Sequence, residues 1–343
     1  MRNFFHWWLA QRFGAIIPTA TKAAVPAMIE KLQATYTNPN LKFESLNYPT
    51  GDKAPYIAWF TDAAHHSLGV VINPYTGKIM GDYEWDKTWH GILLHLHYSL
   101  LAGETGILVM GVVALLTVIL GITGIILWPG WRKLSAGFKI KWNGHIKRTN
   151  FDIHKVAGIV TAVFLVLTGF TGFAWNVPQA HIEEAIYALT FTPKLSEPVS
   201  KPIPNQKPLP FKDLLQRADA IFPNAKITSI DLAHQPEGIF IVGKKQAGET
   251  IPWGSTSIAF DRFSGEVVQL EDGMKPSRAK AILNQFTPLH YGTFAGIYSQ
   301  ILYFFVGLTP TILLVTGFIM WWHRKKRTPS KTNPKRLQEL TKS

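Results

Sequence analysis

The sequence predicts an α-helical membrane protein that also carries two small α+β modules outside the bilayer. Three long runs without any charged residue predict the membrane-spanning helices. The net charge of +13 falls entirely in two short segments beside these runs. An arrangement of one helix, strand-like runs and a turn occurs twice, and it predicts the two modules.

The predicted spans are Gly106–Trp128, Val156–Val177 and roughly Ile297–Trp322. Each has the about 20 apolar residues that cross a hydrocarbon core of about 30 Å. Buried helices of a large soluble protein are the alternative, but they rarely lack charge over this length. Tryptophans at the span ends are typical of a membrane interface, namely Trp128, Trp131, Trp175, Trp321 and Trp322.

The charge distribution predicts the orientation of the spans. Residues 1–128 carry eight basic and eight acidic side chains, and residues 177–285 carry twelve of each, so the excess lies in 129–155 and 323–343. Short basic flanks of apolar spans stay in the cytoplasm. Nucleic-acid binding would instead place the charge on one folded face, so no nucleic-acid partner is expected. The two modules are therefore predicted to be periplasmic and the C-terminus cytoplasmic.

The first segment, Phe4–Ile17, is apolar and aromatic, but Gln11 and Arg12 interrupt it. As a helix it would be about 21 Å long, which is too short to span a bilayer. It also lacks the uninterrupted apolar core of a signal peptide. We expect a first transmembrane helix that is degenerate or truncated.

Each predicted module begins with a helix, Ala23–Tyr36 in the first and Phe211–Ile221 in the second. Each module ends with Asn or Asp, then two residues, then Thr-Gly or Ser-Gly, and this pattern favours a hairpin turn. A Pro-rich connector, Thr192–Pro210, is expected to be a semi-rigid spacer. The strand-like runs are Lys42–Leu46, Tyr56–Thr61 and Leu68–Ile72, then Ile227–Leu232, Gly238–Val242 and Ser257–Phe260.

Two histidines stand before spans in similar phrases, LHYSLL at His97 and LHYGTF at His290. His97 lies 31 positions before Trp128, and His290 lies 32 before Trp322. If both helices are continuous and run the same way, the imidazoles lie at nearly equal height, as two axial ligands of one haem would. Histidines that bind a neighbouring module at the interface are the alternative.

His95 points about 200° away from His97 on a helix, so it is the fallback ligand. His90 shares the face of His97 and is most simply a surface histidine; the alternatives are a gate at the haem edge or a substrate-binding residue. The chain has no cysteine, so any haem or other redox centre needs non-thiolate ligands. Five aromatic residues are a candidate docking surface or, more simply, module core: Tyr48, Trp59, Tyr83, Trp85 and Trp253.

Four phrases, "INPYTGKIMG", "LHYSLLAGETG", "DIHKVAGIV" and "PLHYGTFAGIYSQ", resemble the PepSY-associated transmembrane (PepSY_TM) family over residues 20 to 327. Members of that family include inner-membrane ferric-siderophore reductases of the ferrioxamine type. The resemblance implies four transmembrane helices, periplasmic PepSY modules and haem b held by histidines in a bacterial inner membrane. The first helix departs from the family pattern, because only Phe5-His6-Trp7-Trp8-Leu9 is similar to its opening phrase.

The resemblance also implies that His154 is a ligand of an inner haem, with a partner from the first helix. His323 could replace that partner, although "WWHRKKR" is typical of a simple stop-transfer end. His6 is a candidate only if the N-terminus is cytoplasmic. The predicted haem-iron ligands are thus His97, His290 and His154, with His95, His323 and His6 as alternatives.

The expected function is transmembrane electron transfer through haem b, by an oxidoreductase that reduces a periplasmic ferric siderophore or other iron chelate. The sequence has no nucleotide-binding fingerprint, so quinol or a separate reductase must donate the electrons. A non-enzymatic, membrane-anchored PepSY interaction or inhibitory module is the alternative.

The predicted organisation follows the chain in eight segments. These are the degenerate first helix (1–20), module 1 (21–88), a helix with an outer extension and a span (89–128), a basic cytoplasmic loop (129–153), a span (154–177), the Pro-rich connector with module 2 (178–283), a helix with an outer extension and a span (284–323), and a basic cytoplasmic tail (324–343).

Overall fold

A computed structural model describes residues 2–176, 179–196, 198–200, 206–232 and 239–325. The chain divides into two compact units. Unit 1 comprises Met1–Met110 and Ala174–Pro288, and unit 2 comprises Gly111–Phe173 and Leu289–Ser343. The predicted basic tail beyond Lys325 lies outside the described residues, as do residues 201–205 of the connector and Gly238 of one predicted strand.

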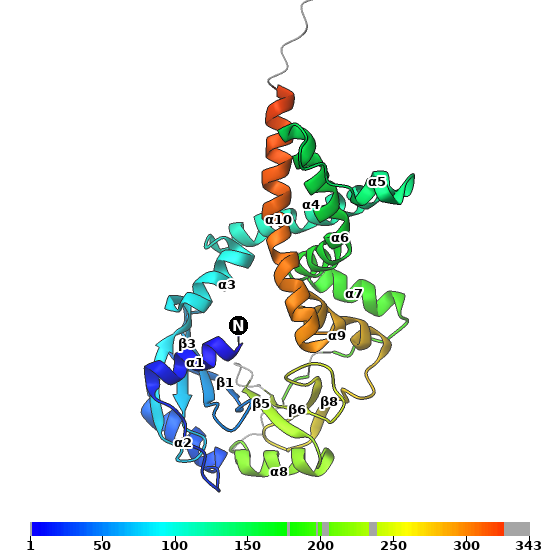
Figure 1. Cartoon of the computed structure of the whole chain (residues 1–343). Helices are drawn as coiled ribbons and strands as arrows, with labels where there is room; N and C mark the ends of the chain where they lie inside the picture. Colours follow the sequence, from blue (N-terminus) through cyan, green and yellow to red (C-terminus); the bar gives the residue numbers. More distant parts are fainter. Residues whose placement is uncertain (1, 177–178, 197, 201–205, 233–238, 326–343) are drawn as a thin grey trace, which may run out of the picture. The chain divides into compact units, whose positions relative to one another are not determined.

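Unit 1 contains an eight-stranded antiparallel sheet in the order β4-β3-β2-β1-β5-β6-β7-β8 (Figure 1). Each predicted module forms one half of it, and the halves join where β1 pairs with β5. Leu46 of β1 lies opposite Ile230 of β5, and both side chains are fully buried. This pairing removes one exposed edge from each half. The strands are β1 (Lys42–Asn47), β2 (Tyr56–Thr61), β3 (Ser67–Ile72), β4 (Ile79–Glu84), β5 (Lys226–Leu232), β6 (Phe240–Lys245), β7 (Thr256–Phe260) and β8 (Val267–Glu271).

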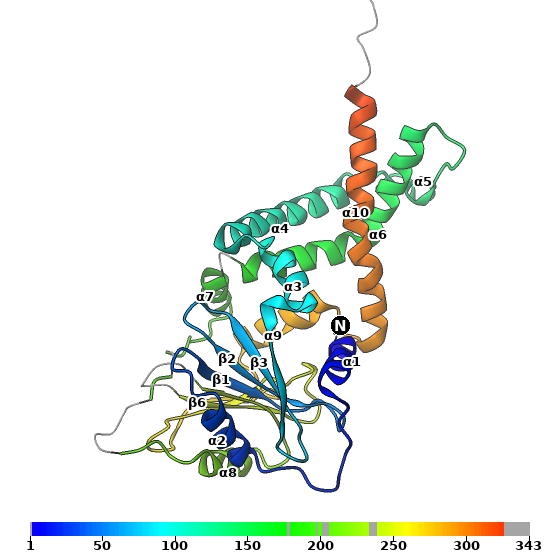
Figure 2. The same cartoon turned by 90° about the vertical axis from the view of Figure 1, so that its left-hand side faces the viewer.

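Helices α2 (Val25–Thr35) and α8 (Phe211–Ile221) cover the same face of this sheet (Figure 2). The short helix α1 (Arg2–Phe13) packs on the other face, where Leu9 contacts a cluster around Tyr83. The predicted degenerate first helix is therefore a 12-residue helix that packs on unit 1. Three helices in the described part of the chain are long and apolar enough to cross a membrane, and α1 is not among them.

The predicted hairpin turn is confirmed in both halves. The Asn73 side-chain oxygen accepts hydrogen bonds from the backbone N–H groups of Tyr75 and Thr76, and Asp261 accepts the equivalent pair from Phe263 and Ser264. The following glycines, Gly77 and Gly265, have φ angles of 62° and 72°. These left-handed conformations explain why glycine closes both turns.

The helices near the predicted spans are broken just after the two echoed histidines. Helix α3 (Trp89–Ser99) is separated from α4 (Gly103–Ile126), and α9 (Arg278–Tyr291) is separated from α10 (Gly296–Lys325). The equivalent glycines Gly103 and Gly296 both have positive φ, 55° and 62°. The assumption of continuous helices is therefore wrong, and the height match calculated from it does not hold. The remaining helices are η1 (Trp85–Lys87), η2 (Pro129–Trp131), α5 (Leu134–Phe138), α6 (Ile146–Trp175) and α7 (Gln179–Leu189).

Candidate functional site

Within unit 2, helix α6 runs antiparallel to the segment from His290 through α10. Along the chain from the residue before α6, His145 contacts His323, Phe164 contacts Tyr303, and Thr171 contacts His290. The partners thus follow one another in reverse order along the chain. This packing brings two of the predicted ligands, His154 and His290, each against a threonine of the opposite segment.

The first histidine–threonine couple joins His290 to Thr171. The distance from His290 Nδ1 to Thr171 Oγ1 is 2.8 Å, and the same hydroxyl donates to the Leu167 carbonyl oxygen at 2.8 Å. With the single hydroxyl proton directed to that carbonyl, the imidazole is the donor at Nδ1. The unprotonated nitrogen is then Nε2, which can bind a metal through its lone pair.

The second couple joins His154 to Thr316 and repeats this arrangement. The distance from His154 Nδ1 to Thr316 Oγ1 is 2.9 Å, and Thr316 Oγ1 donates to the Ile312 carbonyl oxygen at 2.7 Å. The tautomer is again the one with the proton on Nδ1. Both histidines therefore contact a threonine hydroxyl through Nδ1, and each hydroxyl donates to a carbonyl of its own helix.

A glycine follows each threonine of the two couples and lets the imidazole approach the helix. A Cβ atom at Gly172 would lie 3.3 Å from His290 Cε1, and one at Gly317 would lie 3.6 Å from His154 Cε1. The first distance is tighter than an ordinary carbon contact of about 3.5–4.0 Å. A larger residue at 172 would therefore press on the His290 ring.

The two couples lie near opposite ends of one span. His154 and Thr171 are 17 residues apart on α6, which corresponds to about 25 Å along the helix axis. A hydrocarbon core is about 30 Å thick. Phe164 and Tyr303 lie between the couples, with ring centroids 5.8 Å apart in an edge-to-face contact.

The residues around His290 suit a bound group with polar atoms. Among the described residues, the buried hydroxyls of Thr293 and Tyr303 have no hydrogen-bond partner. Buried hydroxyls are normally satisfied, so a group with acceptor oxygens is expected beside them. A metal-binding histidine usually donates its other ring N–H to an oxygen, as His290 and His154 do here. Each couple therefore offers one imidazole that could hold a haem iron.

His95 of unit 1 already uses both of its ring nitrogens. Nε2 lies 2.8 Å from Asp86 Oδ1, and Nδ1 lies 2.7 Å from the Tyr98 hydroxyl. Burial, and then the charge of Asp86, raise the pKa of Tyr98, so this hydroxyl stays protonated and can donate to Nδ1 of a neutral His95 ring. His95 then donates to Asp86 through Nε2. Ligation by His95 would break one of these two bonds.

His97 lies exposed in the last turn of α3, in unit 1, whereas His290 belongs to unit 2. Their axial pairing therefore stays a prediction.

His323 contacts His145 at a ring-centroid distance of 5.7 Å and lies seven residues beyond Thr316, about 10 Å along α10. The structure thus brings His154 to Thr316, and His323 to His145. His6 lies on α1 of unit 1, where it lines a small pocket with Leu9.

The expectation that His90 is a surface histidine is wrong. Its side chain is only 8% exposed and lies among aromatic rings, with centroid distances of 3.4 Å to Trp89 and 4.8 Å to Phe5. The reason is that α1 covers this part of unit 1.

Of the five candidate docking aromatics, only Trp253 is exposed. The other four pack in or against the two hydrophobic clusters of unit 1, namely Tyr48, Trp59, Tyr83 and Trp85.

Sequence reasoning missed the threonines, although a signal for them exists. The dipeptide Thr-Gly occurs in all three predicted spans, at Thr123-Gly124, Thr168-Gly169, Thr171-Gly172 and Thr316-Gly317, and two of these four threonines contact a histidine. A small polar residue followed by glycine is typical of close contacts between membrane helices. Which histidine each dipeptide meets depends on how the helices pack, so the sequence alone did not pair them.

The chain was compared with known proteins. The pattern of the PepSY-associated TM region matches residues 5–324, which run from α1 into the end of α10. The comparison with curated proteins found no match.

Proposed function

We propose that this chain, which belongs to the PepSY-associated TM family, is a membrane oxidoreductase that carries single electrons across the bacterial inner membrane with haem b. The proposed acceptor is a ferric siderophore or another iron chelate on the periplasmic side. The observation that supports this best is the repeated histidine–threonine couple, which holds a histidine through Nδ1 near each end of α6.

The residues of the couples would hold and orient the ligands. Each threonine hydroxyl would donate a hydrogen bond to a carbonyl of its own helix and accept one from the Nδ1–H group of the histidine, which fixes the tautomer and restrains rotation of the ring. The Thr293 and Tyr303 hydroxyls would bind the polar edge of the group beside His290. His154 is the proposed ligand near the other end of α6, and His97 on α3 is proposed as a further haem ligand.

Haem b held by two histidines supplies a one-electron couple without an open coordination position. The chain spaces the two histidine–threonine couples along α6, and each couple supplies one histidine. The rings of Phe164 and Tyr303 occupy the helix contact between the two couples, and apolar side chains of the spans exclude water from it. Because the sequence has no nucleotide-binding fingerprint, the proposed donor is quinol or a separate reductase.

Purification of the full chain after haem supplementation tests the proposal through its absorption spectrum. We expect a b-type, low-spin signal that falls in His290→Ala and is unchanged in His181→Ala, since His181 is an exposed histidine of α7. A chain that folds and binds no haem under these conditions would contradict the proposal. It would support the non-enzymatic interaction module instead.

A further inference from the structure

We propose that the connection between α4 and α6 is a binding site for anionic phospholipid headgroups. We call residues 129–155 the basic cap; they belong wholly to unit 2 and include η2, α5 and the first turns of α6. The inference concerns lipid binding and does not depend on haem or electron transfer.

The basic cap is folded around the buried side chain of Trp128. This indole is 6% exposed and lies against Phe138, with ring centroids 5.1 Å apart. A Cβ atom at Gly130 or Gly137 would clash with the indole, so both glycines are needed for this packing. The cap therefore presents its side chains from a defined backbone.

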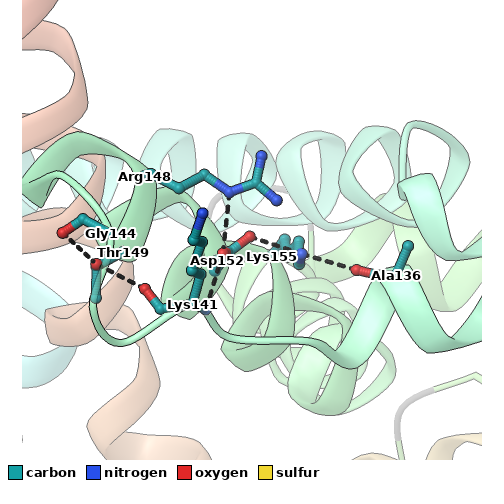
Figure 3. A network of polar contacts seen from close by, with 7 residues as sticks. All are labelled: Ala136, Lys141, Gly144, Arg148, Thr149, Asp152 and Lys155. Carbon is teal, nitrogen blue, oxygen red and sulfur yellow. Dashed lines mark hydrogen bonds and ion pairs between the residues drawn. The ribbon is translucent and has the colours of Figure 1, made fainter.

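Asp152 fastens the basic cap to α6 (Figure 3). Its carboxylate accepts hydrogen bonds from the Lys141 backbone N–H at 3.1 Å, Arg148 Nε at 3.1 Å and Lys155 Nζ at 2.7 Å. Lys155 Nζ also donates to the Ala136 carbonyl oxygen at 2.8 Å. The two ends of the segment 136–141 are thus tied to the same point on α6.

This network removes the only acidic side chain from the surface of the basic cap. Asp152 is fully buried, and its partner Lys155 is 9% exposed, so the two form an internal ion pair. Every other charge in the cap is positive and reaches the surface. These residues are Arg132, Lys133, Lys139, Lys141, Lys147 and Arg148.

Exposed aromatic and aliphatic side chains lie between these cations. They are 66% exposed at Trp131, 65% at Leu134 and 70% at Trp142. Two helices that can span a membrane flank the cap, Gly103–Trp131 and Ile146–Trp175. Basic residues interleaved with tryptophans beside a span are typical of a surface that meets lipid headgroups.

An acidic soluble protein is the other partner that a basic surface could bind. The exposed Trp131, Leu134 and Trp142 favour lipid, since apolar side chains beside a span can insert between headgroups at little cost. The proposed ligand is therefore an anionic lipid of the phosphatidylglycerol type, whose phosphate pairs with lysines such as Lys133, Lys139 and Lys141.

The test measures lipid selectivity of the full chain in nanodiscs. Spin-labelled phosphatidylglycerol and phosphatidylcholine report which lipid is held at the protein surface. We compare the wild type with Lys133→Gln/Lys139→Gln/Lys141→Gln and with a matched control, Lys31→Gln/Lys53→Gln/Lys78→Gln, which removes three exposed lysines from unit 1.

We expect the wild type to prefer phosphatidylglycerol and to lose this preference at high salt. A lysine near an anionic surface contributes up to about fivefold in binding, so the cap variant should lose most of the preference while the control keeps it. An equal preference in the cap variant and the wild type would overturn the proposal. An equal loss in the control would also overturn it, because net charge and not the cap would then be responsible. The absence of any preference in the wild type, together with capture of an acidic soluble protein by the cap lysines, would assign the surface to that partner.

Discussion

The two histidine–threonine couples of unit 2 have the same hydrogen-bond chemistry but different surroundings. His290 lies at the end of α9, just before the non-helical connection to α10, where Gly292 and Gly296 have φ angles of 65° and 62°. His154 lies inside the continuous helix α6, two residues after the buried Asp152. The same histidine–threonine hydrogen bond is therefore supported by two different backbone arrangements. Beside His290, the hydroxyls of Thr293 and Tyr303 are buried and could donate to a bound group. Beside His154, the buried Asp152 fixes the first turns of the continuous helix α6.

The largest effect is expected from removal of either histidine. His290→Ala should abolish the haem signal of its site, because it loses the nitrogen proposed to bind iron. For the same reason, His154→Ala should abolish the haem signal of the other site or change its spectrum. Haem per chain and the low-spin absorption band measure both losses. His181→Ala is the matched control on the exposed helix α7. An unchanged haem content in His290→Ala would separate that couple from the cofactor.

Asp152→Ala should affect the His154 couple alone. It leaves Lys155 buried without its counter-charge, and loss of one member of such a pair costs about 3–5 kcal/mol. We expect a lower thermal unfolding midpoint and a changed spectrum at the His154 site, with the His290 site unaffected. Glu104→Ala, at an exposed acid in the first turn of α4, is the control. An equal midpoint for both variants would contradict the role given to Asp152.

Replacement of either threonine should weaken haem binding at its site, and by a similar factor at the two sites. Thr171→Val and Thr316→Val keep the side-chain shape and remove the acceptor for Nδ1–H, and loss of such a partner typically weakens metal binding by about 10–100-fold. Haem titration of the two single variants measures this. Thr123→Val is the control, because its hydroxyl bonds only to carbonyls of its own helix. Full affinity in both variants would show that the couples do not orient ligands.

Tyr303→Phe should act only at the His290 site, and more weakly. It removes one buried hydroxyl that has no partner among the described residues. If that hydroxyl binds the cofactor, its loss costs about 1 kcal/mol, or about fivefold in haem affinity. Without such a bond the same change should leave affinity unaltered and raise stability, since a buried unsatisfied group is removed.

The smallest effect is expected at the fallback ligand. His95→Ala should leave most of the haem spectrum, because both nitrogens of His95 are engaged by Asp86 and Tyr98. His97→Ala is the informative partner variant on the same helix. Loss of the signal in His95→Ala with retention in His97→Ala would reverse the choice between them.

Much of the fold follows from local signals in the sequence. The charge-free runs predict helices that can span a membrane, and the phrases around Gly77 and Gly265 predict the two hairpin turns. Both rest on residue types whose physics is local: apolar length in the first case and glycine with positive φ in the second. The short α1 also agrees with an apolar segment too short to span.

Other features depend on contacts between distant segments. The joining of the two modules through β1 and β5 needs two edge strands to meet, and no local pattern encodes this. The break after α3 places Leu100 and Leu101 at φ angles of 52° and 58°, a conformation that leucine seldom adopts and does not signal. The pairing of His290 with Thr171 likewise requires knowing which helix faces meet.

The haem content of the double variant His154→Ala/His290→Ala tests the central claim most directly. The wild type and the variant are purified as full chains after the same haem supplementation, and bound haem is quantified per protein. The account predicts a b-type signal in the wild type and loss of stoichiometric haem from a folded double variant. A double variant with the haem content and spectrum of the wild type would contradict it.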